Sequence, residues 1–231
     1  MTTTDNKQQP AVAAPDARSV AASTSHLDQL FQKLDPRRTR LIFAVDATGS
    51  REATWDLAAQ STAGMIRAAA GSGGIELQLV YFRGDQECVA SKWMADAIAI
   101  AKVMSEVKCR AGVTQIRRVL AHIGKENARH KVAAAILISD ACEENPNQLF
   151  AAASALRVPV FMFQEGHDEI VAGIFKKIAN ITDGAASTFD AGAAARLADL
   201  LKAVSAFATG GRAALAGQGT EAARLLLTQL K

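Results

Sequence analysis

Short apolar runs alternate along the chain with segments in which apolar residues recur every three or four positions. A strand that is buried on both faces has a continuous apolar sequence, whereas a helix packed on one side carries an apolar stripe. Repeated strand–helix units favour a parallel sheet covered by helices on both faces. The sequence therefore predicts a doubly wound α/β fold (a Rossmann-like arrangement), with strands expected at 41–45, 77–82, 134–139, 158–163 and 187–189.

One strand is expected to depart from the parallel arrangement. The residues at 84–87, Gly-Asp-Gln-Glu, are typical of a hairpin turn, and they lead into a short strand around 88–90. This hairpin predicts one antiparallel strand at the edge of the sheet. The apolar stripe that follows predicts a helix carrying Trp93, Ala97, Ile100, Met104 and Val107.

Composition changes at both ends of the chain predict its domain organisation. Residues 1–26 are polar and rich in Ala and Pro without periodicity, so a flexible arm is expected there, followed by a short helix at 27–34. The domain is predicted to span 27–209, with Asp190 capping its last helix. Residues 210–231 are expected to form one appended helix, with an apolar face that includes Leu226.

Charge, cysteine content and hydropathy argue against a disordered chain, a nucleic-acid-binding protein, a disulfide scaffold and a membrane protein. The 231 residues are 49% hydrophobic and carry a formal net charge of +3, which argues against disorder and does not indicate a nucleic-acid partner. The three cysteines lack C-x-x-C spacing and are expected to be reduced thiols. No apolar run is long enough for a signal peptide or a membrane span. We therefore expect a soluble, cytoplasmic protein without a membrane partner.

The first predicted strand ends in a carboxylate followed by two hydroxyls at alternate positions. In Asp46-Ala47-Thr48-Gly49-Ser50, all three polar side chains can point at one centre while Gly49 permits a tight turn. The same five residues also suit a plain helix start, in which Ser50 caps the helix and Asp46 accepts hydrogen bonds from loop amides.

Two further loops add oxygen ligands at the same edge of the predicted sheet. Asp140 directly follows the strand at 134–139, which in a doubly wound sheet lies beside the first strand where the strand order reverses. The loop at 109–114 supplies the hydroxyl of Thr114. Two carboxylates and three hydroxyls suit a small divalent cation such as Mg²⁺ or Mn²⁺, and Ca²⁺ also accepts oxygen ligands.

These residues resemble the metal-ion-dependent adhesion site of the von Willebrand factor type A (VWA) domain, also called the integrin inserted domain. The family's site reads Asp-x-Ser-x-Ser after the first strand, then a Thr, then an Asp at a later strand end. The resemblance covers about residues 38–208 and includes the order of strands and helices. Within this range the sequence is similar to stand-alone bacterial VWA proteins. The matching positions are Asp46, Thr48, Ser50, Thr114 and Asp140.

The resemblance implies a metal-dependent protein-binding module rather than an enzyme. An Asp or Glu side chain of a partner protein would complete the coordination of the ion. In this family the last helix of the domain, here about 193–208, can shift when the site is occupied. Two departures are visible: Thr48 stands where Ser is usual, and Ala141 follows Asp140 where Gly is usual. Neither removes a ligand.

Two other hypotheses remain open. A metal-assisted hydrolase of phosphates or esters would need a general base beside the ion, and Glu143 is the candidate, with Glu144 next to it. The four histidines show no H-E-x-x-H pattern, which disfavours a zinc hydrolase. Alternatively, the chain is a metal-free scaffold subunit. Cys109 and Cys142 lie close to predicted site residues, and uncoupled thiols are the favoured interpretation for both.

Overall fold

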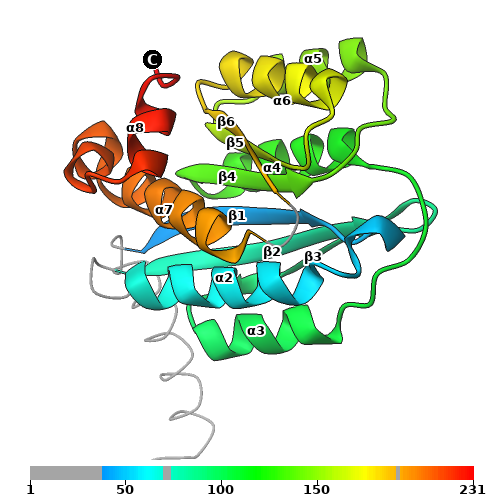
Figure 1. Cartoon of the computed structure of the whole chain (residues 1–231), viewed down its shortest axis with the longest axis horizontal. Helices are drawn as coiled ribbons and strands as arrows, with labels where there is room; N and C mark the ends of the chain where they lie inside the picture. Colours follow the sequence, from blue (N-terminus) through cyan, green and yellow to red (C-terminus); the bar gives the residue numbers. More distant parts are fainter. Residues whose placement is uncertain (1–37, 70–73, 191–192) are drawn as a thin grey trace, which may run out of the picture. The chain divides into compact units, whose positions relative to one another are not determined.

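A six-stranded sheet with the order β3-β2-β1-β4-β5-β6 forms the centre of the fold (Figure 1). The computed structural model describes residues 38–69, 74–190 and 193–231, so the expected arm at 1–26 and helix at 27–34 lie outside the described residues. All strand pairs are parallel except β2–β3, as predicted. The strands are β1 (Thr39–Asp46), β2 (Ile75–Arg83), β3 (Glu87–Met94), β4 (Ala134–Ser139), β5 (Val160–Glu165) and β6 (Ala186–Phe189).

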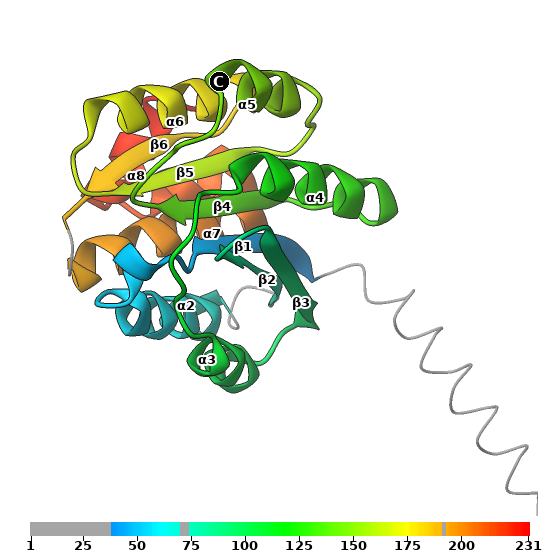
Figure 2. The ribbon, with the colours of Figure 1, turned by 90° about the vertical axis from the view of Figure 1, so that its right-hand side faces the viewer.

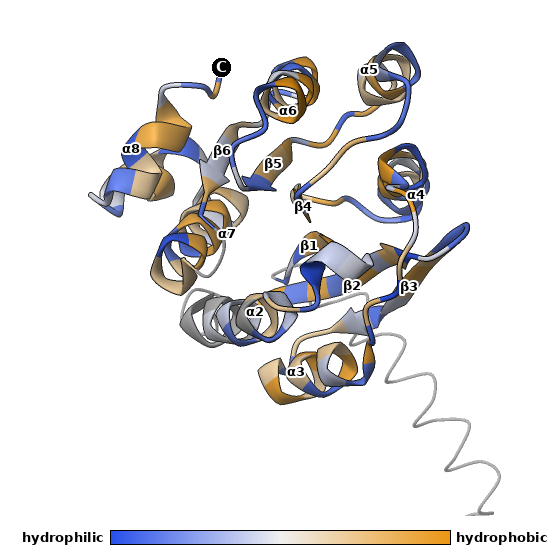
Figure 3. Cartoon of the chain, turned by 45° about the vertical axis from the view of Figure 1, so that its right-hand side comes forward, coloured by the Kyte–Doolittle hydropathy of each residue, from blue (hydrophilic) through white to orange (hydrophobic). Residues whose placement is uncertain are grey.

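Helices cover both faces of this sheet (Figure 2). One face packs against α2 (Trp55–Ala69), α3 (Ala97–Glu106), α7 (Ala194–Gly217) and α8 (Glu221–Leu227). The other packs against α4 (Ile116–Arg129), α5 (Pro146–Ser154) and α6 (Glu169–Ile181). The helices carry both apolar and polar residues, as amphipathic helices at a sheet surface do (Figure 3). The predicted doubly wound α/β fold is confirmed.

Alternate residues of β1 explain why this strand reads as a continuous apolar run. Leu41, Phe43 and Val45 belong to the core on the α2/α7 face, whereas Ile42 and Ala44 belong to the core on the α4/α6 face. All five are fully buried. Burial of a Leu, Ile, Val or Phe side chain stabilises a fold by about 1.5–3 kcal/mol, so β1 anchors both layers.

The strand β3 is longer than predicted, and the helix after it is shorter. Trp93 lies in β3 opposite Gln78, not on a helix as its spacing to Ala97 suggested. The helix α3 begins only after Asp96, whose carboxylate accepts a 2.9 Å hydrogen bond from the backbone N–H of Ile98. Asp96 stands two residues after the end of β3 and caps the helix, a signal that the apolar spacing through Trp93 obscured.

Two expectations near the C-terminus are wrong in detail. The residue that precedes α7 is Ala193, whereas the Asp190 carboxylate contacts His167 at 2.5 Å and does not cap the helix. The expected single helix at 210–231 is broken, because Gly219 has a φ of 63° and Thr220 caps the separate helix α8. The helix α7 is also kinked, with non-helical backbone at 210–211.

A side chain from the C-terminal segment hydrogen-bonds to the first residue of the edge strand β6. The carboxamide of Gln229 accepts a 2.9 Å hydrogen bond from the Ala186 N–H and donates a 2.9 Å hydrogen bond to the Ala186 carbonyl. It thereby occupies backbone groups that an added strand would use, which protects an edge against pairing with another chain. Among the described helices, none is long and apolar enough to cross a membrane.

Candidate metal centre

The end of β1 forms a short chain of hydrogen bonds through the predicted Asp-x-Thr-x-Ser residues. Asp46 is fully buried, and its Oδ1 accepts a 2.8 Å hydrogen bond from the backbone N–H of Thr48. The hydroxyls of Thr48 and Ser50 lie 3.2 Å apart. Ser50 is exposed on the 3₁₀ turn η1 (Gly49–Arg51), which begins three residues after the end of β1. The three side chains therefore lie together at the carboxyl-terminal end of β1.

The neighbouring strand β4 brings a serine and a second carboxylate to the same place. Ser139 donates a 2.5 Å hydrogen bond from its Oγ to Oδ2 of Asp46. The next residue, Asp140, has a buried Oδ1 for which no hydrogen-bond partner exists among the described residues. An unpaired buried carboxylate oxygen is costly and needs a positive group. Ser139 was not predicted as a site residue, although it stands beside Asp140 in the sequence.

Burial and like charge act together on Asp46. Burial raises the pKa of its carboxyl above the ordinary value, hydrogen bonds from Ser139 and Thr48 lower it, and the nearby charge of Asp140 raises it further. The two carboxylates are thus close enough to repel one another. Such repulsion is relieved when a cation lies between or beside them.

Thr114 is fixed to the loop that carries Asp140. The Thr114 N–H donates a 3.0 Å hydrogen bond to Oε2 of Glu143, and the Glu143 N–H donates a 3.1 Å hydrogen bond to Oγ1 of Thr114. The loop before Thr114 is held to the β1 end by a 3.0 Å hydrogen bond from the Arg110 N–H to the Ala47 carbonyl. The three loops that carry the predicted ligands therefore meet at the carboxyl-terminal ends of the strands.

The two glutamates after Asp140 have structural partners. Glu143 clamps Thr114 as described, and Glu144 accepts hydrogen bonds from the N–H groups of Ile116 and Arg117 at the start of α4. Burial raises the pKa of the Glu144 carboxyl, and these two hydrogen bonds oppose the rise. Glu143 is the general base that the hydrolase hypothesis requires. Its carboxylate already accepts a backbone hydrogen bond from Thr114.

A buried ion pair next to the site was missed by the sequence analysis. The side chain of Arg51 is 1% exposed and pairs with the carboxylate of Glu165 at the end of β5. Glu165 also accepts a 3.1 Å hydrogen bond from Oγ1 of Thr54. Burial lowers the pKa of the Arg51 guanidinium, and the charges of Asp140 and Asp46 act against this lowering. The positive charge therefore lies within electrostatic reach of both predicted carboxylate ligands.

The residues present fit a divalent cation with oxygen ligands. Asp46 and Asp140 supply two carboxylates, one of which has an unpaired buried oxygen, and Thr48, Ser50 and Thr114 supply hydroxyls. In the described part of the chain, no group of three or more His, Cys, Asp and Glu side chains is arranged to hold a metal. A hard cation such as Mg²⁺, held by few charges and water, is what this donor set suits.

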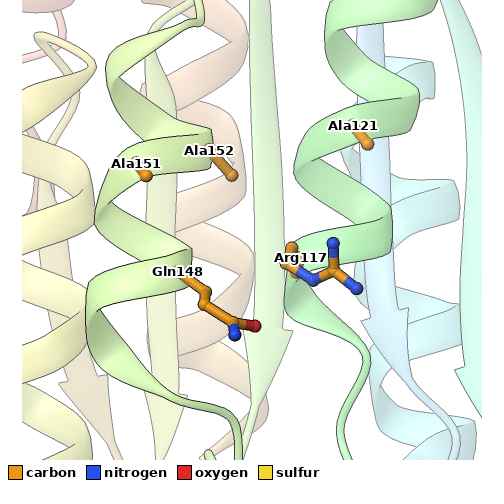
Figure 4. Close-up of a pocket in the computed structure, with 5 residues that line it drawn as sticks. All are labelled: Arg117, Ala121, Gln148, Ala151 and Ala152. Carbon is orange, nitrogen blue, oxygen red and sulfur yellow. The ribbon is translucent and has the colours of Figure 1, made fainter.

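A separate hollow of about 460 Å³ lies between α4 and α5 (Figure 4). Small side chains on the facing helices leave this space open. The lining residues are Arg117, Ala121, Gln148, Ala151 and Ala152. None of them is a predicted metal ligand, so the hollow is distinct from the candidate metal centre.

Comparison with known proteins supports the family resemblance at the level of the fold. No protein-family model and no curated protein sequence matches the chain. The VWA domain of SpRpn10 superposes with a TM-score of 0.57 at 12% identity, over 75% of this chain and 98% of that domain. The vWF domain of the type V pili tip protein Mfa5 from Porphyromonas gingivalis gives 0.54 at 10% identity, over 73% of this chain and 94% of that one.

A larger protein contains the same arrangement. The open conformation of the pilus adhesin SpaC from Lactobacillus rhamnosus GG superposes with a TM-score of 0.59 at 12% identity, over 75% of this chain and 30% of the adhesin. These superpositions, together with the strand order and the antiparallel edge strand, show that the chain has the VWA fold. The fold that the sequence resemblance implied is therefore confirmed.

Proposed function

We propose that this protein is a metal-dependent protein-binding module. A Mg²⁺ or Mn²⁺ ion would be held by Asp46 and Asp140 and by the hydroxyls of Thr48, Ser50 and Thr114. The ion would supply a positive centre with coordination positions left open for a carboxylate of a partner protein. This function suits the fold, since the pilus adhesin SpaC contains the same fold.

The buried Oδ1 of Asp140, which lacks a hydrogen-bond partner among the described residues, is the observation that carries this proposal. Asp140 also lies within electrostatic reach of the buried carboxylate of Asp46, which accepts hydrogen bonds from Ser139 and from the Thr48 N–H. Two neighbouring carboxylates with one unsatisfied oxygen favour a bound cation over a set of loops held only by hydrogen bonds.

Each side chain has a definite task in this function. Ser139 and the Thr48 N–H orient Asp46, and Glu143 orients Thr114, so the oxygen ligands are positioned before the ion arrives. Such preorganisation lowers the entropic cost of binding.

The three free thiols, all half-buried, support a reducing, cytoplasmic location for the protein.

The first experiment is thermal unfolding in chelator and in millimolar Mg²⁺ or Mn²⁺. An ion at a hundredfold excess over its Kd stabilises the folded state by about 2.7 kcal/mol, which raises Tm by roughly 5–10 °C for a chain of this size. We expect this rise in the wild type and its loss in Asp46→Ala. Asp199→Ala, which removes an exposed carboxylate on α7, is the matched control and should keep it.

The second experiment tests the partner's chemistry. Peptides that contain Asp or Glu are compared with their Asn or Gln counterparts for binding in Mg²⁺ and in chelator. The proposal expects binding only for the acidic peptides and only with the ion. Absence of both the Tm rise and the binding would favour the scaffold hypothesis, and metal-dependent turnover of a phosphate or ester substrate would favour the hydrolase.

A further inference from the structure

The side chain that directly follows the Asp-x-Thr-x-Ser residues is a buried cation. Arg51 comes directly after Ser50, and its guanidinium is 1% exposed. An arginine side chain does not lose its proton in proteins, so this is a permanent positive charge inside the fold. Its Nε and Nη2 have no hydrogen-bond partner among the described residues. A buried arginine of this kind is rare unless nearby negative charge compensates it.

The carboxylates around Arg51 exceed its charge. Glu165 pairs with the guanidinium directly, and Asp140 and Asp46 also stabilise its charged form. Three carboxylates and one guanidinium leave two negative charges at the carboxyl-terminal ends of these strands. One divalent ion would neutralise both charges. Arg51 is a buried positive group within electrostatic reach of Asp140, whose buried Oδ1 has no hydrogen-bond partner among the described residues.

We propose that Arg51 is an internal cation of the metal centre, which competes with the divalent ion for Asp46 and Asp140 and is restrained by Glu165. This inference rests on the proposed function. Glu165 holds the guanidinium at the end of β5 and so keeps its charge from displacing the ion. The Arg51–Glu165 pair therefore sets the affinity of the site without supplying a ligand.

An electrostatic role and a purely structural role predict different results. If the pair only links η1 to β5, removal of either partner should weaken the fold and either weaken ion binding or leave it unchanged. If the pair tunes the site by charge, the two removals should act in opposite directions. Arg51→Met leaves three uncompensated carboxylates, whereas Glu165→Gln leaves an unrestrained guanidinium beside the ligands.

The test is a double-mutant cycle with Mg²⁺ and Mn²⁺ affinity as the readout, measured by isothermal titration calorimetry after chelator treatment. We expect the Kd to fall about tenfold in Arg51→Met and to rise about tenfold in Glu165→Gln, as one unit charge near a divalent ion predicts. The double variant restores the wild-type balance of charge and should bind close to wild type. Retained unfolding transitions verify that each variant is folded.

A second Arg–Glu pair in the chain supplies the matched controls. Arg129 and Glu126 form a 3.0 Å ion pair at the C-terminal end of α4, the end of that helix away from Thr114. Arg129→Met and Glu126→Gln change the net charge of the protein identically but should leave the Kd unchanged. If Arg51→Met does not fold, Glu165→Gln carries the test, because Gln keeps the shape of the side chain.

Each outcome separates this inference from the proposed function. The wild type could bind the ion while Arg51→Met and Glu165→Gln change its Kd in the same direction or leave it unchanged. This result would overturn the role of Arg51 and leave the proposed function standing. Ion binding in Arg51→Met but not in the wild type would support the competition and overturn metal-dependent binding by the natural chain. No ion binding in any of these variants would overturn both.

Discussion

At the scale of single residues, the position of Asp46 depends on the hydroxyl of Ser139. Removal of this 2.5 Å hydrogen bond by Ser139→Ala leaves Oδ2 of a fully buried carboxylate without its donor. Loss of a buried hydrogen bond to a charged group costs about 1.5–3 kcal/mol, so we expect a lower denaturant midpoint in chelator. Ser154→Ala removes an exposed helical hydroxyl and should change stability by less than about 0.5 kcal/mol. Equal effects of the two substitutions would contradict this prediction.

The thiol of Cys142 provides a pH-dependent prediction. Burial raises its pKa from 9.0 to about 11. The folded protein therefore holds this proton more tightly than the unfolded chain, so its contribution to stability is complete below pH 9 and is lost as the pH rises toward 11. Alkylation of Cys142 in the native protein, followed by mass spectrometry, should be slow at pH 8 and increase only near pH 11. Fast native labelling at pH 8, comparable with that in urea, would contradict a protonated thiol.

The residues of the candidate site differ in how well a sequence can indicate them. Asp46, Thr48 and Ser50 form a motif because they are close in the chain, and Asp140 follows an obvious buried strand. Arg51, in contrast, reads as an ordinary surface charge after a turn. Its partner Glu165 stands at the end of another strand, and only the packing of η1 against β5 shows that both are buried. Pairing between distant charges leaves no local pattern in a sequence.

At the scale of structural elements, the loop that carries Thr114 depends on a close backbone contact. A Cβ at Gly112 would lie 2.1 Å from the carbonyl oxygen of Gly84, so the two loops approach more closely than any side chain allows. We expect Gly112→Ala to displace the loop and to reduce the ion-dependent rise in Tm, in addition to lowering stability in chelator. Both quantities come from the same thermal unfolding series.

A glycine elsewhere in the domain serves as the control for this substitution. Gly173 lies exposed within α6, and a Cβ there would have no atom within 4 Å. Gly173→Ala should stabilise the helix by about 0.5–1 kcal/mol and leave the ion effect intact. An unchanged ion effect in Gly112→Ala would show that Thr114 does not depend on this contact.

The predicted elements agree best with the structure where burial is complete. The strands β1 and β4 are apolar on both faces, and the structure places them side by side at the reversal of strand order, as predicted. The edge strand β3 contains only partly exposed and exposed residues, without a buried apolar run, so the sequence did not separate its end at Met94 from the helical stripe that follows. Local sequence specifies central strands more clearly than edge strands, because only the former are buried on both faces.

At the scale of the whole molecule, both cores could be predicted from periodicity, but the place of the C-terminal residues could not. A stripe of Leu and Ala predicts a helix with one apolar face without indicating which surface that face covers. The structure places Leu215 and Leu226 in the same core as Leu41 and Phe43 of β1. The return of the chain at 218–220 decides this arrangement, and it depends on the positive φ of Gly219.

The stability of the whole domain depends on this shared core. Leu226 on α8 is fully buried and belongs to the core that also contains residues of α7 and the sheet. Leu226→Ala should cost about 2–5 kcal/mol, which lowers Tm by roughly 5–15 °C in a domain of this size. Thr228→Ala, an exposed position in the same segment, should change Tm by little. If residues 218–231 were an independent appendage, Leu226→Ala would instead leave the main unfolding transition unchanged and only increase proteolysis of the C-terminal segment.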